Sequence, residues 1–398
     1  MTRSTFRLLL VPLALSAAPA LVSAATAPAA SGFGAAISGL TVDEKARFAA
    51  GHEVFVETED AADGLGPVFN DNSCVACHST PEAGGGSTRV ETRFGKETRR
   101  GGFDALESLG GSLIQEQGIG VQAECNFVGE TVPAEANVTA GRRTTPLFGL
   151  GLVDAVPDAT LVALAARQRM RTPATAGRTH LVPDAVSGEQ HVGRFGWKAQ
   201  VSSLLHFAGD AYLNEMGITS PFFPDENCPQ GDCSLLRCDL VPDPEDDGAD
   251  VFQFADFMSL LAPPPRLAAS ADKRVVGDGQ RVFDRVGCAD CHTPALRTGP
   301  SEVAALSNRE FAPYSDFLLH DMGALGDGIA QNGAEPREMR TAPLWGLRVL
   351  ETFLHDGRAT TIENAILAHD GQGRMARERF RNLSKDDRTS LLRFLRTL

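Results

Sequence analysis

The chain has 398 residues, of which 42% are hydrophobic and 22% are charged, so it is long enough for two globular domains with their own cores. This composition excludes a disordered chain. The formal net charge of -14 disfavours nucleic acid and anionic membranes as partners and favours a basic protein partner.

The first residues have the pattern of a secretory signal peptide. Two arginines precede an apolar run, and residues 22–24 form a small-x-small cleavage pattern. An uncleaved membrane anchor is the alternative, but Pro12 and Pro19 interrupt a run that is short for a bilayer span. We therefore expect residues 1–24 to be removed, and a periplasmic protein without a membrane span to begin at Ala25.

Helix signals are spread over the chain, whereas strand signals are scarce. Thr41 and Glu44 form a capping box, which predicts a helix that leads toward residue 54. Residues 251–261 have an apolar helical face, and Ser384 with Asp387 opens a last amphipathic helix. We expect a mainly α fold with long loops and an insertion in the N-terminal half.

Two Cys-x-x-Cys-His pentapeptides carry the strongest functional signal. The first consists of Cys74, Cys77 and His78, and the second of Cys288, Cys291 and His292. Two thiols three positions apart can add to the vinyl groups of one porphyrin, and the next residue places an imidazole under the iron. A zinc site would need the four cysteines together, and a dithiol catalyst has no use for the histidine. The sequence therefore predicts two covalently attached haem c groups with proximal histidine ligands.

Four cysteines lie outside these motifs, at Cys125, Cys228, Cys233 and Cys238. In an oxidising compartment an even number predicts two disulfides, and the sequence leaves three pairings open. Cys228 and Cys233 bound a loop rich in turn residues, where a disulfide would restrain the chain. A structural metal site is the alternative.

A proline-rich stretch separates two similar halves of the chain. Residues 51–55 before the first haem motif match residues 279–283 before the second, and residues 143–150 match residues 340–347 downstream. This internal repeat predicts two related haem domains. We expect an N-terminal domain over residues 25–262, a linker over residues 263–271 and a C-terminal domain over residues 272–398.

Three further segments carry a resemblance to a known family. These segments are Gly64–Asn70, Gly193–Lys198 and Phe353–Thr360. With the haem motifs they resemble the bacterial di-haem peroxidase superfamily, and more closely its di-haem oxidoreductase branch, over nearly the whole mature chain. The resemblance implies two cytochrome c-like domains, in which one haem reacts with peroxide and the other passes electrons.

The second haem is expected to have two protein ligands, because an iron that only transfers electrons is best held on both faces. Thr360 caps a predicted helix that carries His369 on its third turn, and relatives place a methionine or tyrosine ligand at the matching position. We expect His369 to be the distal ligand of the His292 haem; a surface histidine at a helix end is the alternative. His320 and Met322 are alternative distal ligands for this haem, but we expect packing roles for both.

The first haem lacks such a ligand in the sequence. No histidine occurs between His78 and His180, where many relatives place a displaceable one. We therefore expect an open distal face at the His78 haem, although His206 is a candidate to reach that iron. By resemblance, Glu215 is the candidate acid-base group that moves a proton between the two peroxide oxygens, and a solvated surface glutamate is the alternative.

Three arginines are candidates to bind haem propionates. Arg143 and Arg340 head the repeated segments, and Arg358 belongs to the third resembling segment. A guanidinium suits bidentate contact with a carboxylate, and ordinary surface pairing is the alternative. The calcium site of some relatives is not carried over, because residues 350–353 lack their threonine-proline pattern, so bound calcium stays uncertain.

These features predict an exported di-haem c-type oxidoreductase that reduces hydrogen peroxide or acts on a small oxidisable substrate. Electrons from a small donor such as a cytochrome c or cupredoxin would enter at the His292 haem and leave at the His78 haem. Trp197 and Trp345 are candidate relays, although the tryptophan expected by analogy after the first repeated segment is absent. A non-catalytic electron-transfer cytochrome and a high-valent oxidation of an organic or protein substrate are the alternatives.

Overall fold

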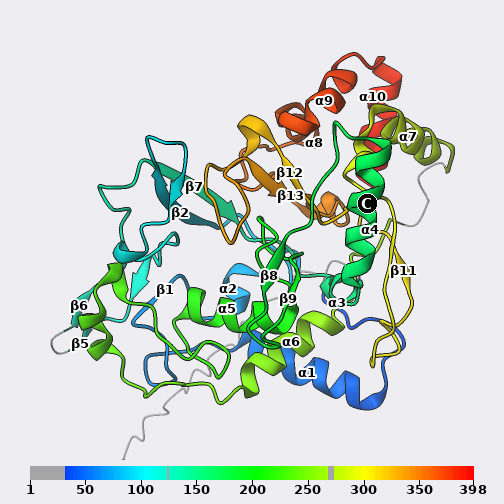
Figure 1. Cartoon of the computed structure of the whole chain (residues 1–398). Helices are drawn as coiled ribbons and strands as arrows, with labels where there is room; N and C mark the ends of the chain where they lie inside the picture. Colours follow the sequence, from blue (N-terminus) through cyan, green and yellow to red (C-terminus); the bar gives the residue numbers. More distant parts are fainter. Residues whose placement is uncertain (1–31, 123–124, 268–272) are drawn as a thin grey trace, which may run out of the picture.

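The computed structural model describes residues 32–122, 125–267 and 273–398 (Figure 1). The predicted signal peptide and part of the predicted linker, residues 268–271, lie outside the described residues. Within the described ranges, no helix combines the length and apolar character that crossing a membrane requires.

Helices α1 and α6 lie at one end of the molecule and α7 to α10 at the other, with α2 to α5 between them (Figure 1). They are α1 (Val42–Val56), α2 (Cys74–Cys77), α3 (Leu150–Asp154), α4 (Asp158–Arg171), α5 (Leu204–Met216), α6 (Ala249–Leu260), α7 (Lys273–Val286), α8 (Ile362–Ala368), α9 (Arg374–Arg381) and α10 (Lys385–Leu395). Short 3₁₀ helices connect several of them, including one at Cys288–Asp290.

The strands are short and pair in antiparallel ladders. They are β1 (Val68–Phe69), β2 (Val90–Glu97), β3 (Phe103–Asp104), β4 (Gln117–Gly118), β5 (Gly120–Gln122), β6 (Cys125–Phe127), β7 (Val138–Arg143), β8 (Leu181–Pro183), β9 (Gln190–Val192), β10 (Leu296–Arg297), β11 (Glu310–Phe311), β12 (Leu319–Asp321) and β13 (Glu338–Arg340). The longest ladder joins β2 to β7 and places Glu91 opposite Arg142.

The expected mainly α fold is confirmed only in part. Helices account for 35% of the structure and strands for 15%. The strands were not foreseen because a ladder such as β2–β7 is built from polar residues of two segments far apart in sequence. Tertiary pairing, rather than intrinsic preference, makes these segments extended.

The first helix pair confirms the predicted capping box. The Thr41 hydroxyl accepts the Glu44 N–H, and the Glu44 carboxylate accepts the Thr41 N–H. Helix α1 packs against α6, and the two backbones come close at Gly51, where a Cβ would lie 2.2 Å from the Gln253 carbonyl oxygen. Only a glycine fits this crossing.

The second helix pair repeats this arrangement. Helix α7 packs against α10, and a Cβ on Gly279 would lie 2.3 Å from the Ser390 carbonyl oxygen. Ser384 caps α10 as predicted, because its hydroxyl accepts the Asp387 N–H at 3.1 Å. The internal repeat of the sequence therefore corresponds to two helix crossings, each of which leads into one Cys-x-x-Cys-His motif.

The proline stretch packs between the two downstream repeats. Gly149 and Gly346 both have a left-handed backbone, with φ of 75° and 76°. A Cβ on Gly149 would lie 2.8 Å from Pro263, and one on Gly346 would lie 3.2 Å from Pro264. The matching segments thus meet the same stretch of chain from two sides.

The largest hydrophobic core draws on both halves of the chain. Phe148 and Phe257 share one cluster with Phe311 and Phe317, which follow the linker. A second cluster gathers residues of α7, α9 and α10 around Phe283. The predicted boundary after residue 262 does not separate these cores, and the division into two haem domains stays a prediction.

One predicted disulfide is confirmed. Cys228 and Cys233 are bonded to each other, and Cys238 is also in a disulfide. The Cys125 side chain lies outside the described residues.

Candidate di-haem site

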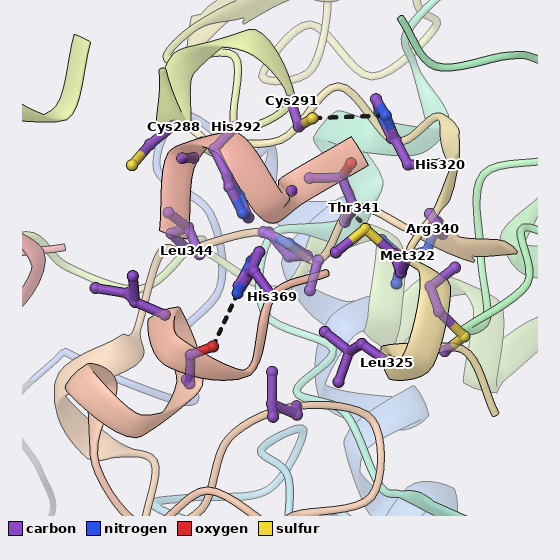
Figure 2. Close-up of a pocket in the computed structure, with 18 of the residues that line it drawn as sticks. Cys288, Cys291, His292, His320, Met322, Leu325, Arg340, Thr341, Leu344 and His369 are labelled. Carbon is purple, nitrogen blue, oxygen red and sulfur yellow. Dashed lines mark hydrogen bonds between the residues drawn. The ribbon is translucent and has the colours of Figure 1, made fainter. Parts of the chain in front are cut away.

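A cavity of about 460 Å³ lies beside the second Cys-x-x-Cys-His motif. Cys288, Cys291 and His292 form one wall, and His369 from the end of α8 lies opposite (Figure 2). Much of the remaining lining is apolar, as at Leu344. A flat apolar macrocycle attached to the two thiols would fit this space.

The His292 and His369 rings are positioned to bind one metal ion from opposite sides. His292 Nδ1 lies 3.0 Å from the Tyr314 carbonyl oxygen, and His369 Nδ1 lies 2.8 Å from that of Ala365. Both rings therefore donate from Nδ1 and keep the Nε2 lone pair free, as metal-ligating histidines do. Burial lowers the pKa of His292 to about 4 and also lowers the pKa of His369, which keeps both rings neutral.

The separation of these rings matches a shared iron. Their centres are 6.4 Å apart, with 56° between the ring planes (Figure 2). With metal–nitrogen bonds of about 2 Å, and about 1 Å more from each nitrogen to its ring centre, two axial imidazoles would lie about 6 Å apart. The residues at the second site therefore fit a haem iron held on both faces.

The helix that carries His369 differs slightly from the prediction. Thr361, rather than Thr360, is the N-cap, because its hydroxyl accepts the Asn364 N–H at 3.0 Å. Helix α8 ends at Ala368, so His369 is the C-cap residue and does not lie on a third turn. Two adjacent threonines offered the same capping chemistry, and the sequence could not distinguish them.

His320 is engaged elsewhere, in agreement with the expected packing role. Its Nε2 donates to the Asp316 carboxylate at 2.9 Å, and its Nδ1 lies 3.5 Å from Cys291 Sγ (Figure 2). Met322 lines the same cavity.

The first motif has the same proximal anchoring. His78 Nδ1 lies 3.0 Å from the Gly85 carbonyl oxygen, and burial lowers the pKa of His78 to about 4. The Phe55 ring packs beside it with centres 6.2 Å apart. Within the described part of the chain, no second histidine ring faces His78 as His369 faces His292. The two sites therefore share the attachment side and differ on the other.

Carboxyl groups gather near the first motif. Glu215, in α5, accepts a hydrogen bond from Asn70 Nδ2 at 2.8 Å and shares another with Glu91 from β2. Burial raises the pKa of Glu215 to about 8, and the Glu91 charge adds to this effect. Burial also raises the pKa of Cys77 to about 11, and the charges of Glu215 and Glu91 add to this effect, so both carboxylates act electrostatically on this thiol.

Glu91 and Arg93 were missed by the sequence reasoning. Arg93 donates to Glu91 from Nε at 2.8 Å and from Nη2 at 3.2 Å. Alternate residues of a strand share one face, so the spacing of Glu91 and Arg93 could have indicated that their side chains lie together. It could not be used because β2 itself was not predicted.

His206 shows no contact with the first motif. Its Nδ1 accepts the Ala185 N–H at 3.2 Å, and its ring packs against Phe223 with centres 5.4 Å apart. Within the described residues it makes no hydrogen bond or ring contact with His78. Its predicted approach to that iron stays a prediction.

Arg143 and Arg340 are buried and line the cavity. Arg340 donates to the backbone oxygens of Gly196 at 2.6 Å and Thr341 at 3.1 Å, and burial lowers its pKa to about 10. Arg143 donates to the Thr352 carbonyl oxygen, and its buried Nε has no partner.

Among the residues that the structure describes, neither arginine has an ion-pair partner. Burial lowers the pKa of both arginines, and the one carboxylate that acts on Arg340, Asp316, is hydrogen-bonded to His320. A buried cation without a counter-charge of its own is costly, so the two arginines fit the propionate groups of a haem. Arg358 instead pairs with Asp356 and its side chain is half exposed, which matches the alternative of a surface pair.

Trp197 lies between the two repeated arginine segments. Its Nε1 donates to the Arg143 carbonyl oxygen at 3.0 Å, and its own carbonyl oxygen accepts the Arg340 N–H at 2.8 Å. Its ring packs edge-on to His355, with centres 6.2 Å apart. Trp345 also lines the cavity.

The resembling segment Gly193–Lys198 ends in a buried ion network. Lys198 Nζ lies 2.8 Å from one Asp327 carboxylate oxygen, and Arg142 lies 2.8 Å from the other. All three side chains are almost fully buried. Lys198 thereby fixes the loop before β13 against the segment that carries Trp197.

The structure does not support a zinc site or a dithiol catalyst at the motif cysteines. Cys74, Cys77, Cys288 and Cys291 are not in disulfides. Burial raises the pKa of Cys74 and of Cys288 to about 12, which disfavours the thiolate that a dithiol catalyst needs. In the described ranges, the one group with metal-ligand spacing consists of carboxylates, at Glu226, Asp243 and Glu245.

Two solved structures are similar to this chain at low sequence identity. Among solved structures, the hydrazine synthase of Kuenenia stuttgartiensis is 16% identical, with 91% of this chain and 90% of that chain covered and a TM-score of 0.40. A MauG-like protein associated with microbial copper homeostasis is 12% identical, with 90% and 91% covered and a TM-score of 0.41. Likenesses this low carry no argument about function.

No functionally curated protein matches the chain significantly. A family model described as di-haem oxidoreductase, putative peroxidase matches residues 126–398, which is more than half of the chain. The chain therefore belongs to the di-haem oxidoreductase family and is an oxidoreductase.

Proposed function

We propose that this di-haem oxidoreductase is an exported peroxidase that reduces hydrogen peroxide with electrons from a small carrier protein. Electrons would enter at the His292 site, and peroxide would react at the His78 site. The observation that carries the proposal is the opposed His292–His369 pair. An iron held on both faces suits electron transfer and leaves substrate chemistry to the other site.

Covalent attachment of the haems is part of this proposal. It is supported by the four motif cysteines, which are free of disulfides, and by the identical anchoring of His78 and His292 to backbone carbonyls. Export to the periplasm is inferred from residues 1–24, and the Cys228–Cys233 disulfide suits an oxidising compartment.

At the first site, the residues of the chain would position the peroxide and supply the proton that its reduction needs. When bound, the two haems would supply the irons for electron transfer and for reaction with peroxide. Reduction of one H₂O₂ to two water molecules consumes two electrons from the donor and two protons. Glu215 would deliver a proton to the outer peroxide oxygen; its electrostatic interaction with Cys77 and its raised pKa, which keeps the acid form available, support this role.

Trp197 is the candidate relay between the sites. Its indole bonds to the segment of Arg143, which leads to the first site, and its backbone bonds to Arg340, which lines the second. This position makes the route plausible without the tryptophan that relatives place after the first repeat.

The alternative of a non-catalytic cytochrome explains fewer features. A pure carrier has no need for an acid with a raised pKa beside one of its sites, as Glu215 is. Oxidation of an organic or protein substrate would use the same sites and differ only in what docks. That reaction is the second candidate if the reduced protein reacts with peroxide but small donors do not sustain turnover.

An anaerobic titration of the fully reduced protein with H₂O₂ tests the proposal. Each haem would give one electron, so one equivalent of peroxide should reoxidise both haems, as followed by optical spectra. Reduced protein that is first saturated with carbon monoxide, which binds ferrous haem, is the control and should react slowly. Peroxide that leaves both haems reduced would contradict the proposed function.

A further inference from the structure

The carboxyl groups of Glu91 and Glu215 meet although they come from distant parts of the chain. Glu91 lies on β2, and Glu215 lies near the end of α5. Their side chains share a hydrogen bond. Two ionised carboxylates are both acceptors, so this contact requires one proton between them.

The surroundings decide which residue carries this proton. Arg93 binds both oxygens of Glu91, at 2.8 and 3.2 Å, which favours the ionised form of Glu91. Glu215 receives only a neutral amide donor, from Asn70 at 2.8 Å. The proton therefore belongs to Glu215.

Of the other charged groups around the pair, Arg142 acts in the same direction as Arg93, whereas Asp210 opposes them. Arg142, opposite Glu91 in the ladder, adds positive charge on the Glu91 side. Asp210, on the same helix as Glu215, interacts with both Arg93 and Glu91 and adds negative charge. Although burial opposes ionisation of both glutamates, the pKa of Glu91 is lowered, whereas that of Glu215 is raised.

We propose that Glu91, anchored by Arg93, is a positioning residue that holds the proton on Glu215 and fixes the Glu215 side chain beside Cys77. This inference rests on the acid role proposed for Glu215. The pair holds one proton before and after a turnover. Glu215 gives its proton to the outer peroxide oxygen, which leaves as water as the O–O bond breaks, and the pair recovers the proton of the inner oxygen. Two electrons from the donor and two protons from solvent then convert the inner oxygen into the second water molecule.

Infrared titration of the holoprotein tests this arrangement with a readout other than activity. The wild-type protein should show the band of a protonated carboxyl group at pH 7, and the Glu215→Gln variant should lack it. In Glu91→Gln the midpoint of this band should fall by about one pH unit, because the neighbouring negative charge is gone. In Arg93→Gln the midpoint should rise, because the cation is gone.

Glu97→Gln is the matched control, because Glu97 lies on the same strand and is exposed. Its midpoint should equal that of the wild type, and each variant must retain two haems by optical spectra. If neither Glu91→Gln nor Arg93→Gln moves the midpoint, or if Glu97→Gln moves it equally, the proposal is wrong. The midpoint could shift in opposite directions in Glu91→Gln and Arg93→Gln while the wild-type protein fails to reduce peroxide. That result would support the Glu91–Glu215 pair and contradict the proposed peroxidase function.

Discussion

The His78 and His292 sites are built alike on the side where each motif attaches. Each proximal histidine places Nδ1 3.0 Å from a backbone carbonyl oxygen, and each motif follows a helix that crosses its partner at a glycine. The opposite sides differ. His292 faces His369 at 6.4 Å, whereas a proton-sharing pair of glutamates lies near the first motif.

This difference shows where two related sites diverge. The repeated segments support the two motifs at which we propose that the haems attach, and His78 and His292 are anchored alike. The other side comes from elements outside those repeats, α8 at the second site and α5 with β2 at the first. The two sites can therefore have different chemistry while the repeated segments that support them stay alike.

The largest expected effect is on peroxide turnover at the first site. In Glu215→Gln the rate should fall by about 10²- to 10⁴-fold, because the group that moves the proton is lost. Steady-state turnover and the rate of haem reduction by a donor should be measured together. Reduction of the His292 haem should stay normal, and an unchanged peroxide rate would remove Glu215 from the mechanism.

A second substitution tests whether the two sites form one structural unit. Lys198→Met leaves Asp327 with one cation in a buried network, so it should lower the free energy of unfolding by about 3–5 kcal/mol. Chemical denaturation followed at both haem bands gives this value. Lys45→Met, at an exposed position on α1, is the control and should change little. Unfolding at one haem only would show that the sites are independent.

The helix crossings offer a direct comparison between the repeats. Gly51→Ala and Gly279→Ala should each cost about 1–3 kcal/mol, because the added Cβ would overlap a carbonyl oxygen of the facing helix. Gly277→Ala on the same helix as Gly279 meets no atom closer than 3.8 Å and should stabilise the protein slightly. Thermal melts measure all three, and a destabilising Gly277→Ala would contradict the packing described.

The smallest effect concerns the charge around the second site. Arg340→Gln should lower the reduction potential of the His292 haem by about 40 mV, because loss of about 1 kcal/mol of interaction with a cation favours the oxidised iron. Arg358→Gln, which removes a surface pair, should leave this potential unchanged. Spectroelectrochemistry measures both potentials. Equal shifts in the two variants would show that Arg340 interacts with the haem no more strongly than a surface arginine does.

Local signals in the sequence were sufficient for the helices that support the sites. The Thr41 and Ser384 caps act within one turn, so they can be recognised without knowing the fold. Gly51 and Gly279 could be matched as a repeat, but their helix crossings could not be predicted. His369 could be found because it lies a short distance from a recognisable segment. Its exact helical position could not, since Thr360 and Thr361 compete as caps.

The proton-sharing pair could not be predicted for a physical reason. Glu91 and Glu215 are 124 positions apart in the sequence, and their contact depends on the pairing of β2 with β7 and on the placement of α5. The alternation of Val90, Thr92 and Phe94 with charged residues suits a strand, but nothing local indicates which segment pairs with it. The buried arginines Arg142 and Arg143 likewise acquire their environment only after the two halves have packed.

The number of exogenous ligands bound per chain tests the inequality of the two sites most directly. We predict that the oxidised wild-type protein binds one cyanide, at the His78 haem, and that His369→Ala binds two. His191→Ala, at a half-exposed histidine on β9, is the control and should bind one. Two cyanides in the wild type, or an unchanged single cyanide in His369→Ala, would contradict the account.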